Sequence, residues 1–167
     1  MAFNPQFKLG VFGRSPALNE QILYILLDAL VAVDELVLRH VPGIPPLYKS
    51  GVFYKSEPLG VDACGHGFED WCDIIDVMKQ GHADCEDLAA WRVAELRAHG
   101  VAARPYVRKP RLLKHKRVLM YHIQVLLPDG RIEDPSRRLG MGQERRYGSS
   151  HNAGATRGRR RLSRIAA

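Results

Sequence analysis

The sequence predicts an α+β fold in which N-terminal helices pack on an antiparallel β-sheet. Apolar residues recur at helical spacing in the first forty positions, and the period changes to two after Gly100. A chain of 167 residues with 46% hydrophobic and 26% charged residues has the composition of one globular domain able to bury a core. Because the helices precede the strands instead of alternating with them, the α+β class is favoured.

A long first helix is expected from Pro16 onward. Ser15 can serve as its N-cap, with proline at the first helical position. The apolar positions that follow at helical spacing are Leu18, Ile22, Ile25, Leu26, Ala29, Leu30, Val33, Leu36 and Val37. Pro42, Gly43, Pro45 and Pro46 end this helix and begin a loop-rich connection that runs to about Gly67.

Two shorter helices should follow. One covers Glu69 to Lys79, and the other begins at Cys85. Asp84 can cap the second helix, with Asp87 at its third position in a capping-box arrangement. Gly100 ends it.

Three strands complete the predicted core. They cover Val101 to Val107, Val118 to Leu127 and Arg131 to Asp134, with Pro128-Asp129-Gly130 as the last turn. The sequence therefore divides into an N-terminal helical segment at 1–45, a core at 46–140 and a basic tail at 141–167.

Charge is uneven along the chain. Residues 1–130 hold 15 Lys and Arg against 15 Asp and Glu, whereas residues 131–167 hold 10 Arg against 3 acidic residues. The tail lacks apolar periodicity and ends in Arg157-Gly158-Arg159-Arg160-Arg161, so by itself it is expected to be disordered.

Several classes of protein are not indicated by this sequence. It has no apolar leader or membrane-spanning run, no phosphate-binding glycine loop and no internal repeat. The three cysteines, Cys64, Cys72 and Cys85, are too few for a disulfide scaffold. We therefore expect a cytoplasmic protein without a cofactor, in which a free thiol is available for chemistry.

Cys85, His122 and Asp134 form the candidate catalytic set. A cysteine in the first turn of a helix feels the positive end of the helix dipole, which favours the thiolate. In the strand Val118 to Leu127, His122 lies on the face opposite the apolar positions. If Leu127 pairs with Arg131, His122 lies diagonal to Asp134 on that face, within reach of a hydrogen bond.

A family resemblance begins at these residues. Gly81-His82-Ala83-Asp84-Cys85-Glu86-Asp87-Leu88-Ala89 resembles the nucleophile segment of the transglutaminase-like superfamily, which has a papain-type fold. Tyr121-His122-Ile123 and Asp134-Pro135-Ser136 resemble the segments that complete its triad. The resemblance covers roughly residues 50 to 140 and is closest to small stand-alone bacterial or phage members. Ala83 and the long basic insert between the first two strands depart from the usual pattern.

This resemblance implies acyl transfer through a thioester. The substrate would be an amide in a peptide or a peptidoglycan-like molecule, hydrolysed without a metal. The backbone N–H of Cys85 would stabilise the oxyanion. Tyr54, Trp71 and Gln80 are the candidates for a second donor.

Other interpretations of the thiols remain open. Cys85 alone could be a small buried residue. Thiolate and imidazole side chains could also bind zinc, although their spacing follows no familiar ligand pattern. The residues of that candidate site are Cys64, His66, Cys72, His82 and Cys85.

Basic residues outside the triad suggest a second class of function. Six of them lie in the insert between the first two predicted strands, where they form either a solvated loop or an anion-binding rim. They are Arg108, Lys109, Arg111, Lys114, Lys116 and Arg117. In the tail, Arg157, Arg159, Arg160 and Arg161 could bind phosphates or neighbouring subunits. The alternative function is thus an assembly protein, for example a phage virion component.

Overall fold

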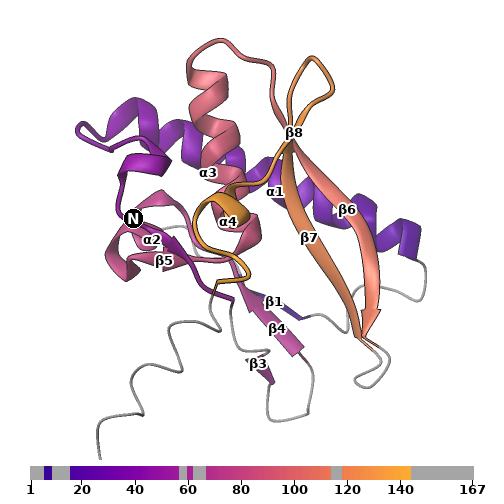
Figure 1. The fold of residues 1–167 in the computed structure, drawn as a ribbon. Coiled ribbons are helices and arrows are strands. Elements are labelled where there is room, and N and C mark those ends of the chain that lie inside the picture. Colours follow the sequence, from indigo (N-terminus) through magenta and orange to yellow (C-terminus); the bar gives the residue numbers. More distant parts are fainter. Residues whose placement is uncertain (1–5, 9–15, 57–59, 62–66, 114–117, 144–167) are drawn as a thin grey trace, which may run out of the picture.

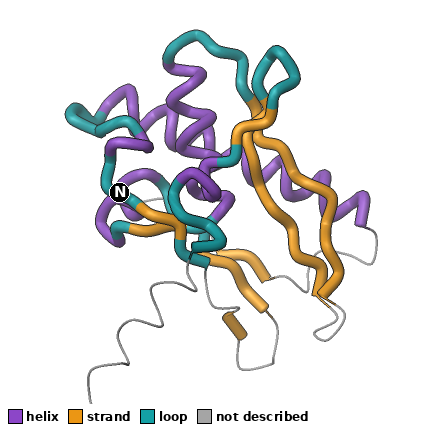
Figure 2. The backbone as a smooth tube through the Cα atoms, in the orientation of Figure 1, coloured by secondary structure: helices purple, strands orange, loops and turns teal. Residues whose placement is uncertain are grey.

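The computed structural model describes residues 6–8, 16–56, 60–61, 67–113 and 118–143. In this part of the chain, helices and strands form the mixed α+β arrangement expected from the sequence. Figure 2 shows one long helix that passes behind the two longest strands, with the other helices beside them. None of the described helices is long and apolar enough to cross a membrane.

The long helix α1 (Pro16–His40) matches the predicted first helix. It is followed by the short helix η2 (Leu47–Lys49) and the strand β2 (Phe53–Tyr54), both inside the stretch expected to be irregular. Ser15, the predicted cap of α1, lies outside the described residues.

The helix predicted from Glu69 was placed too early. Gly67–Asp70 is the strand β4, which pairs with β1 (Gln6–Lys8) and β3 (Gly60–Val61). The helix α2 is Ile74–Gln80. It begins after Asp73, whose carboxylate accepts the N–H groups of Ile75 and Asp76, so this cap fixes the start of the helix.

The helix α3 (Cys85–Ala98) begins at the predicted residue, but the predicted capping box is wrong. Asp84 occupies the cap position without a side-chain cap hydrogen bond. Asp87 is buried, and its Oδ1 accepts the N–H of Cys72 at 2.9 Å. A tertiary contact therefore replaces the local one, and it ties the segment before α2 to the first turn of α3.

The main sheet has the order β6-β7-β8 and is antiparallel throughout. It comprises β6 (Arg104–Leu113), β7 (Val118–Leu126) and β8 (Ile132–Glu133), and α4 (Pro135–Arg138) follows at once. The first strand is longer than predicted, because Arg108, Lys109 and Arg111 belong to β6 and not to a loop. Lys114, Lys116 and Arg117 lie outside the described residues, as do all tail residues after 143.

Two apolar clusters meet at α3. The first joins α1 and α3 to the sheet through Leu27, Val93, Ile123 and Val125. The second joins the other side of α3 to the segment between α1 and β5 (His82–Ala83), through Leu47, Ile74, Leu88 and Trp91. Figure 1 shows α3 between α1 and α4 beside the sheet, so the N-terminus of α3 is fixed from both sides.

Candidate active site

The predicted register between β7 and β8 is confirmed. Val125 pairs with Glu133, and the N–H of Leu127 donates to the carbonyl of Arg131 at 2.9 Å. His122 and Gln124 are half-buried on the face opposite Ile123 and Val125, which lie in the core. The alternation along β7 therefore turns both polar side chains toward Asp134.

Asp134 accepts hydrogen bonds from both of these side chains. Its Oδ2 lies 3.0 Å from Nε2 of His122 and accepts the amide Nε2 of Gln124 at 2.9 Å. Its Oδ1 accepts the N–H of Arg137 at 3.1 Å, so Asp134 is also the N-cap of α4. Burial alone would raise the pKa of Asp134, but the donors from His122, Arg137 and Gln124 outweigh it and hold the pKa below its ordinary value.

This contact decides which nitrogen of His122 is available for chemistry. Since a carboxylate can only accept, Nε2 carries the proton and Nδ1 carries the lone pair. Within the part of the chain that the structure describes, no hydrogen bond occupies Nδ1. The imidazole is thus held in the tautomer that can accept a proton on its far side.

Cys85 lies beside the strand that carries His122. Pairing between β7 and β8 involves only Val125 and Leu126, so Ile123 lies beyond the end of the short strand β8. There the backbone N–H of Ile123 is close enough to the sulfur of Cys85 to act on the pKa of the thiol. The candidate nucleophile therefore lies near the residue next to the candidate base, and within the described residues no hydrogen bond joins Cys85 to His122.

The thiol itself donates to Oε2 of Glu86 at 3.1 Å. Burial raises the pKa of the Cys85 thiol well above its ordinary value, and the carboxylates of Glu86 and Asp84 raise it further. The N–H of Ile123 acts in the opposite direction but is outweighed. Burial and the two neighbouring acids thus oppose the effect of the helix N-terminus, which was expected to favour the thiolate.

The candidate oxyanion donors lie around the start of α3. Tyr54 pairs with Ala83 across the parallel strands β2 and β5, two residues before Cys85. Trp71 is 1% exposed and belongs to the cluster against which Cys85 packs. Gln80 is engaged elsewhere, because its Nε2 lies 3.2 Å from the sulfur of Cys72.

The described residues contain no group of three or more His, Cys, Asp or Glu side chains that could hold a metal ion. Cys72 is buried and contacts Gln80, while His82 contacts the amine of Lys55 at 3.3 Å. Cys64 and His66, two residues of the candidate zinc site, lie outside the described part of the chain.

A polar cluster behind Asp134 was not foreseen from the sequence. Glu133 accepts hydrogen bonds from the hydroxyl of Tyr48 and from Nε of Arg92. Arg92 also contacts Glu95, whose other oxygen accepts the N–H of Leu47 at 2.6 Å. The only sequence signal was the seven-residue spacing between Cys85 and Arg92, which puts both on one side of α3.

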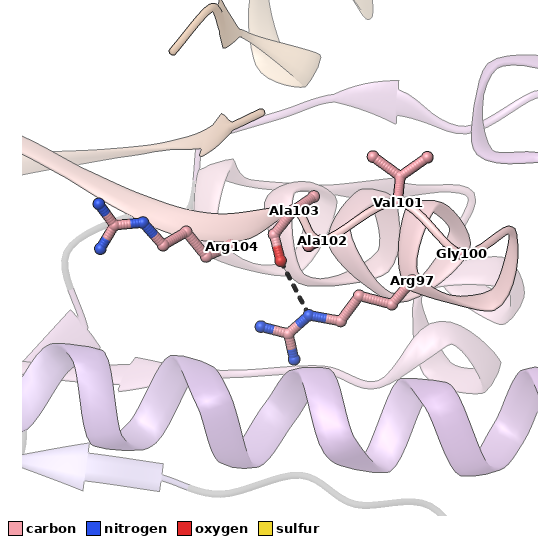
Figure 3. Close-up of a pocket in the computed structure, with 6 residues that line it drawn as sticks. All are labelled: Arg97, Gly100, Val101, Ala102, Ala103 and Arg104. Atoms are coloured by element: carbon pink, nitrogen blue, oxygen red, sulfur yellow. Dashed lines mark hydrogen bonds between the residues drawn. The ribbon is translucent and has the colours of Figure 1, made fainter. Parts of the chain in front are cut away.

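A surface pocket lies away from this site. Figure 3 shows its lining at the C-terminal end of α3, where Nε of Arg97 donates to the carbonyl of Ala103 at 2.9 Å. The other lining residues are Gly100, Val101, Ala102 and Arg104. Cys85 is at the opposite end of this helix, about 20 Å along its axis, so the pocket is separate from the candidate active site.

No family model, curated protein or solved structure matches this chain. A function for the site therefore has to be argued from its own residues.

Proposed function

We propose that this chain is a cysteine-dependent acyl-transfer hydrolase of the transglutaminase-like type, with a papain-like core. Cys85 is the nucleophile, His122 the general base and Asp134 the residue that orients the base. The observation that best supports this proposal is the 3.0 Å contact between Nε2 of His122 and Oδ2 of Asp134, on the strand whose Ile123 N–H lies near the sulfur of Cys85. Asp134 is 12 residues from His122 in the sequence, and Ile123 is 38 residues from Cys85.

The reaction begins with transfer of the thiol proton to Nδ1 of His122. The resulting thiolate attacks the carbonyl carbon of an amide, and a carbon–sulfur bond forms as the carbonyl oxygen becomes an oxyanion. The oxyanion accepts the backbone N–H of Cys85, one of the first-turn N–H groups that have no partner within the helix. Trp71, which lies in the cluster against which Cys85 packs, and Tyr54, which pairs with Ala83, are the candidates for the second donor.

The second half of the reaction releases both products. The carbon–nitrogen bond breaks, the leaving amine takes the proton from the imidazolium, and a thioester remains on Cys85. His122 then removes a proton from water, and the hydroxide attacks the thioester. The acid product leaves as the carbon–sulfur bond breaks, and the imidazolium returns its proton to the sulfur of Cys85. The proposed substrate is an amide in a peptide or a peptidoglycan-like molecule.

Glu86 keeps the thiol of Cys85 protonated before the reaction begins. Because the thiol donates to Glu86, the resting nucleophile is protonated. In this scheme the Cys85 side chain turns from Glu86 toward His122 before its proton is transferred.

An activated ester tests this proposal directly. Incubation with 4-nitrophenyl acetate should give a burst of nitrophenolate and an acetyl group on Cys85 that peptide mass mapping locates. Cys85→Ala and His122→Ala should abolish the burst, whereas Cys72→Ala, which removes a buried thiol outside the proposed triad, should keep it. Acetylation at a residue other than 85, or an unchanged burst in His122→Ala, would refute the triad.

A second candidate function is supported by the charge distribution. The excess of 10 Arg over 3 acidic residues in positions 131–167 suits binding to nucleic acid or to acidic protein subunits during assembly. Deletion of residues 148–167 should abolish salt-dependent binding to DNA or RNA and leave the ester burst intact. Equal nucleic-acid binding by the truncated and full-length chains would rule this function out.

A further inference from the structure

A second set of contacts joins α3, which begins at Cys85, to β8, which precedes Asp134. Glu133 directly precedes Asp134 and ends β8. Its Oε1 accepts Nε of Arg92 at 2.9 Å, and its Oε2 lies 3.5 Å from another guanidinium nitrogen of the same arginine. The side chains of Arg92 and Glu133 are only 22% and 18% exposed, so solvent screens this pair weakly.

Arg92 is placed by the same helix that places Cys85. Seven residues are about two helical turns, or about 10 Å along the axis, so the two side chains leave α3 on the same side. Arg92 is held in turn by Glu95, one turn further on, at 3.1 Å. The guanidinium therefore has a fixed position relative to Cys85.

Tyr48 completes the contact from a third element. Its hydroxyl donates to Glu133, and its ring contacts two guanidinium groups, that of Arg92 at 5.0 Å and that of Arg138 in α4 at 3.8 Å from the ring centre. Burial and the bond to Glu133 raise the pKa of this phenol, so the hydroxyl remains a donor at every physiological pH. These cation–π contacts connect the tyrosine to both α3 and α4.

We propose that Arg92, Glu133 and Tyr48 act as positioning residues that set the distance between Cys85 on α3 and the His122–Asp134 pair on the sheet. This role rests on the proposed function for its effect on catalysis. It also predicts a change in the surroundings of Asp134 that can be measured without any activity.

The positioning contacts are needed because β8 is short. Only two of its residues pair with β7, which is too little to hold Asp134 in register by backbone hydrogen bonds alone. The contact from Arg92 to Glu133 supplies the missing restraint one residue before Asp134. A misplacement of about 1 Å in such an arrangement lowers turnover up to about a hundredfold.

The test compares Arg92→Met, Glu133→Gln and Tyr48→Phe with Arg131→Met. Arg131 pairs with Asp129 at 2.6 Å in the turn of the same hairpin, but both side chains are exposed and neither touches α3. Arg92→Met and Glu133→Gln should lower kcat for the activated ester at least tenfold with little change in KM. Tyr48→Phe should give an intermediate loss, and Arg131→Met none.

The second measurement is the titration of the Asp134 carboxyl by carbon NMR. In Arg92→Met and Glu133→Gln its midpoint should rise toward the ordinary value, as the donors from His122 and Gln124 move away. Arg131→Met should titrate like the wild type. If Arg92→Met does not fold, the nearly isosteric Glu133→Gln and Tyr48→Phe decide the question.

The two proposals fail in different ways. If the wild type shows no acylation of Cys85 but the Asp134 midpoint still rises in Glu133→Gln, the proposed function is wrong and the positioning contact stands. If acylation depends on Cys85 and His122 while folded Arg92→Met and Glu133→Gln match the wild type in kcat and in the Asp134 midpoint, the positioning role is overturned.

Discussion

The thiol of Cys85 donates a hydrogen bond to the carboxylate of Glu86, the next residue on α3, at a distance of 3.1 Å. Glu86 is buried, and its negative charge is the largest cause after burial itself of the raised pKa of Cys85. The candidate nucleophile thus rests beside an acid that disfavours its thiolate.

Replacing Glu86 by Gln should therefore activate the thiol. The amide keeps the shape and can still accept the S–H, but it removes the charge, so the pKa of Cys85 falls and more thiolate is present at neutral pH. Alkylation of Cys85 by iodoacetamide at pH 7.5 should become about three- to tenfold faster. Cys72 in the same sample serves as the internal reference, and a rate at Cys85 that stays equal or falls would contradict the role given to Glu86.

Asp134 has two separable roles, and two substitutions distinguish them. Asp134→Asn keeps an oxygen that can cap α4 but presents an amide donor to Nε2 of His122, which favours the wrong imidazole tautomer. We expect kcat to fall about 10²- to 10⁴-fold with little loss of stability. Asp134→Ala should lose the same activity and in addition about 0.5–2 kcal/mol of stability, because the cap is also lost. Denaturant unfolding of both variants checks this, and equal stability of the two would show that the cap contributes nothing.

Asp87 should contribute to stability through the segment before α2. Its Oδ1 accepts the N–H of Cys72, and truncation in Asp87→Ala would leave that N–H buried without its partner, at a cost of about 1–3 kcal/mol. The melting temperature should fall by about 3–10 °C. Asp129→Ala, at an exposed position in the hairpin turn, is the control and should melt close to the wild type. A wild-type melting temperature for Asp87→Ala would show that the contact is not stabilising.

Asp34 should make stability depend on pH. It is fully buried on α1, where its Oδ1 accepts a hydrogen bond from the N–H of Ile74, and its Oδ2 has no hydrogen-bond partner among the residues that the structure describes. Burial raises its pKa well above the ordinary value of 3.8, and the charge of Asp73 adds to this, while the bond from Ile74 opposes it. The folded state therefore keeps a proton that the unfolded state loses, and stability falls as the pH rises from about 4 toward the folded pKa.

Asp34→Asn should remove this dependence, because the amide keeps the acceptor for Ile74 and does not titrate. Each pKa unit removed corresponds to about 1.4 kcal/mol, or about 3 °C in melting temperature for a chain of this size. Melting curves at pH 5 and pH 8 provide the measurement. Asp28→Asn on the same helix, whose side chain is 63% exposed, should keep the wild-type slope. A persistent slope in Asp34→Asn would assign the pH dependence to another group.

Several features could be predicted from the sequence because they depend on local periodicity. The alternation along Val118–Leu126 placed His122 and Gln124 opposite the core residues Ile123 and Val125, and a three-residue turn fixed their register against Asp134. The long first helix also followed from the spacing of its apolar residues. The helix α3 begins at the predicted residue, Cys85, although the capping box used to predict that start does not form. These features involve residues close in sequence, where backbone geometry leaves few choices.

Only the tertiary structure decided what surrounds Cys85 and Asp134. Asp87 contacts Cys72, 15 residues away, and Arg92 contacts Glu133, 41 residues away. No pattern of neighbouring residues could therefore predict either contact. The thiol pKa depends on burial, which sums contributions from every element packed around α3. Periodicity along a chain fixes which way a side chain points, whereas the packing of distant segments fixes what it meets there.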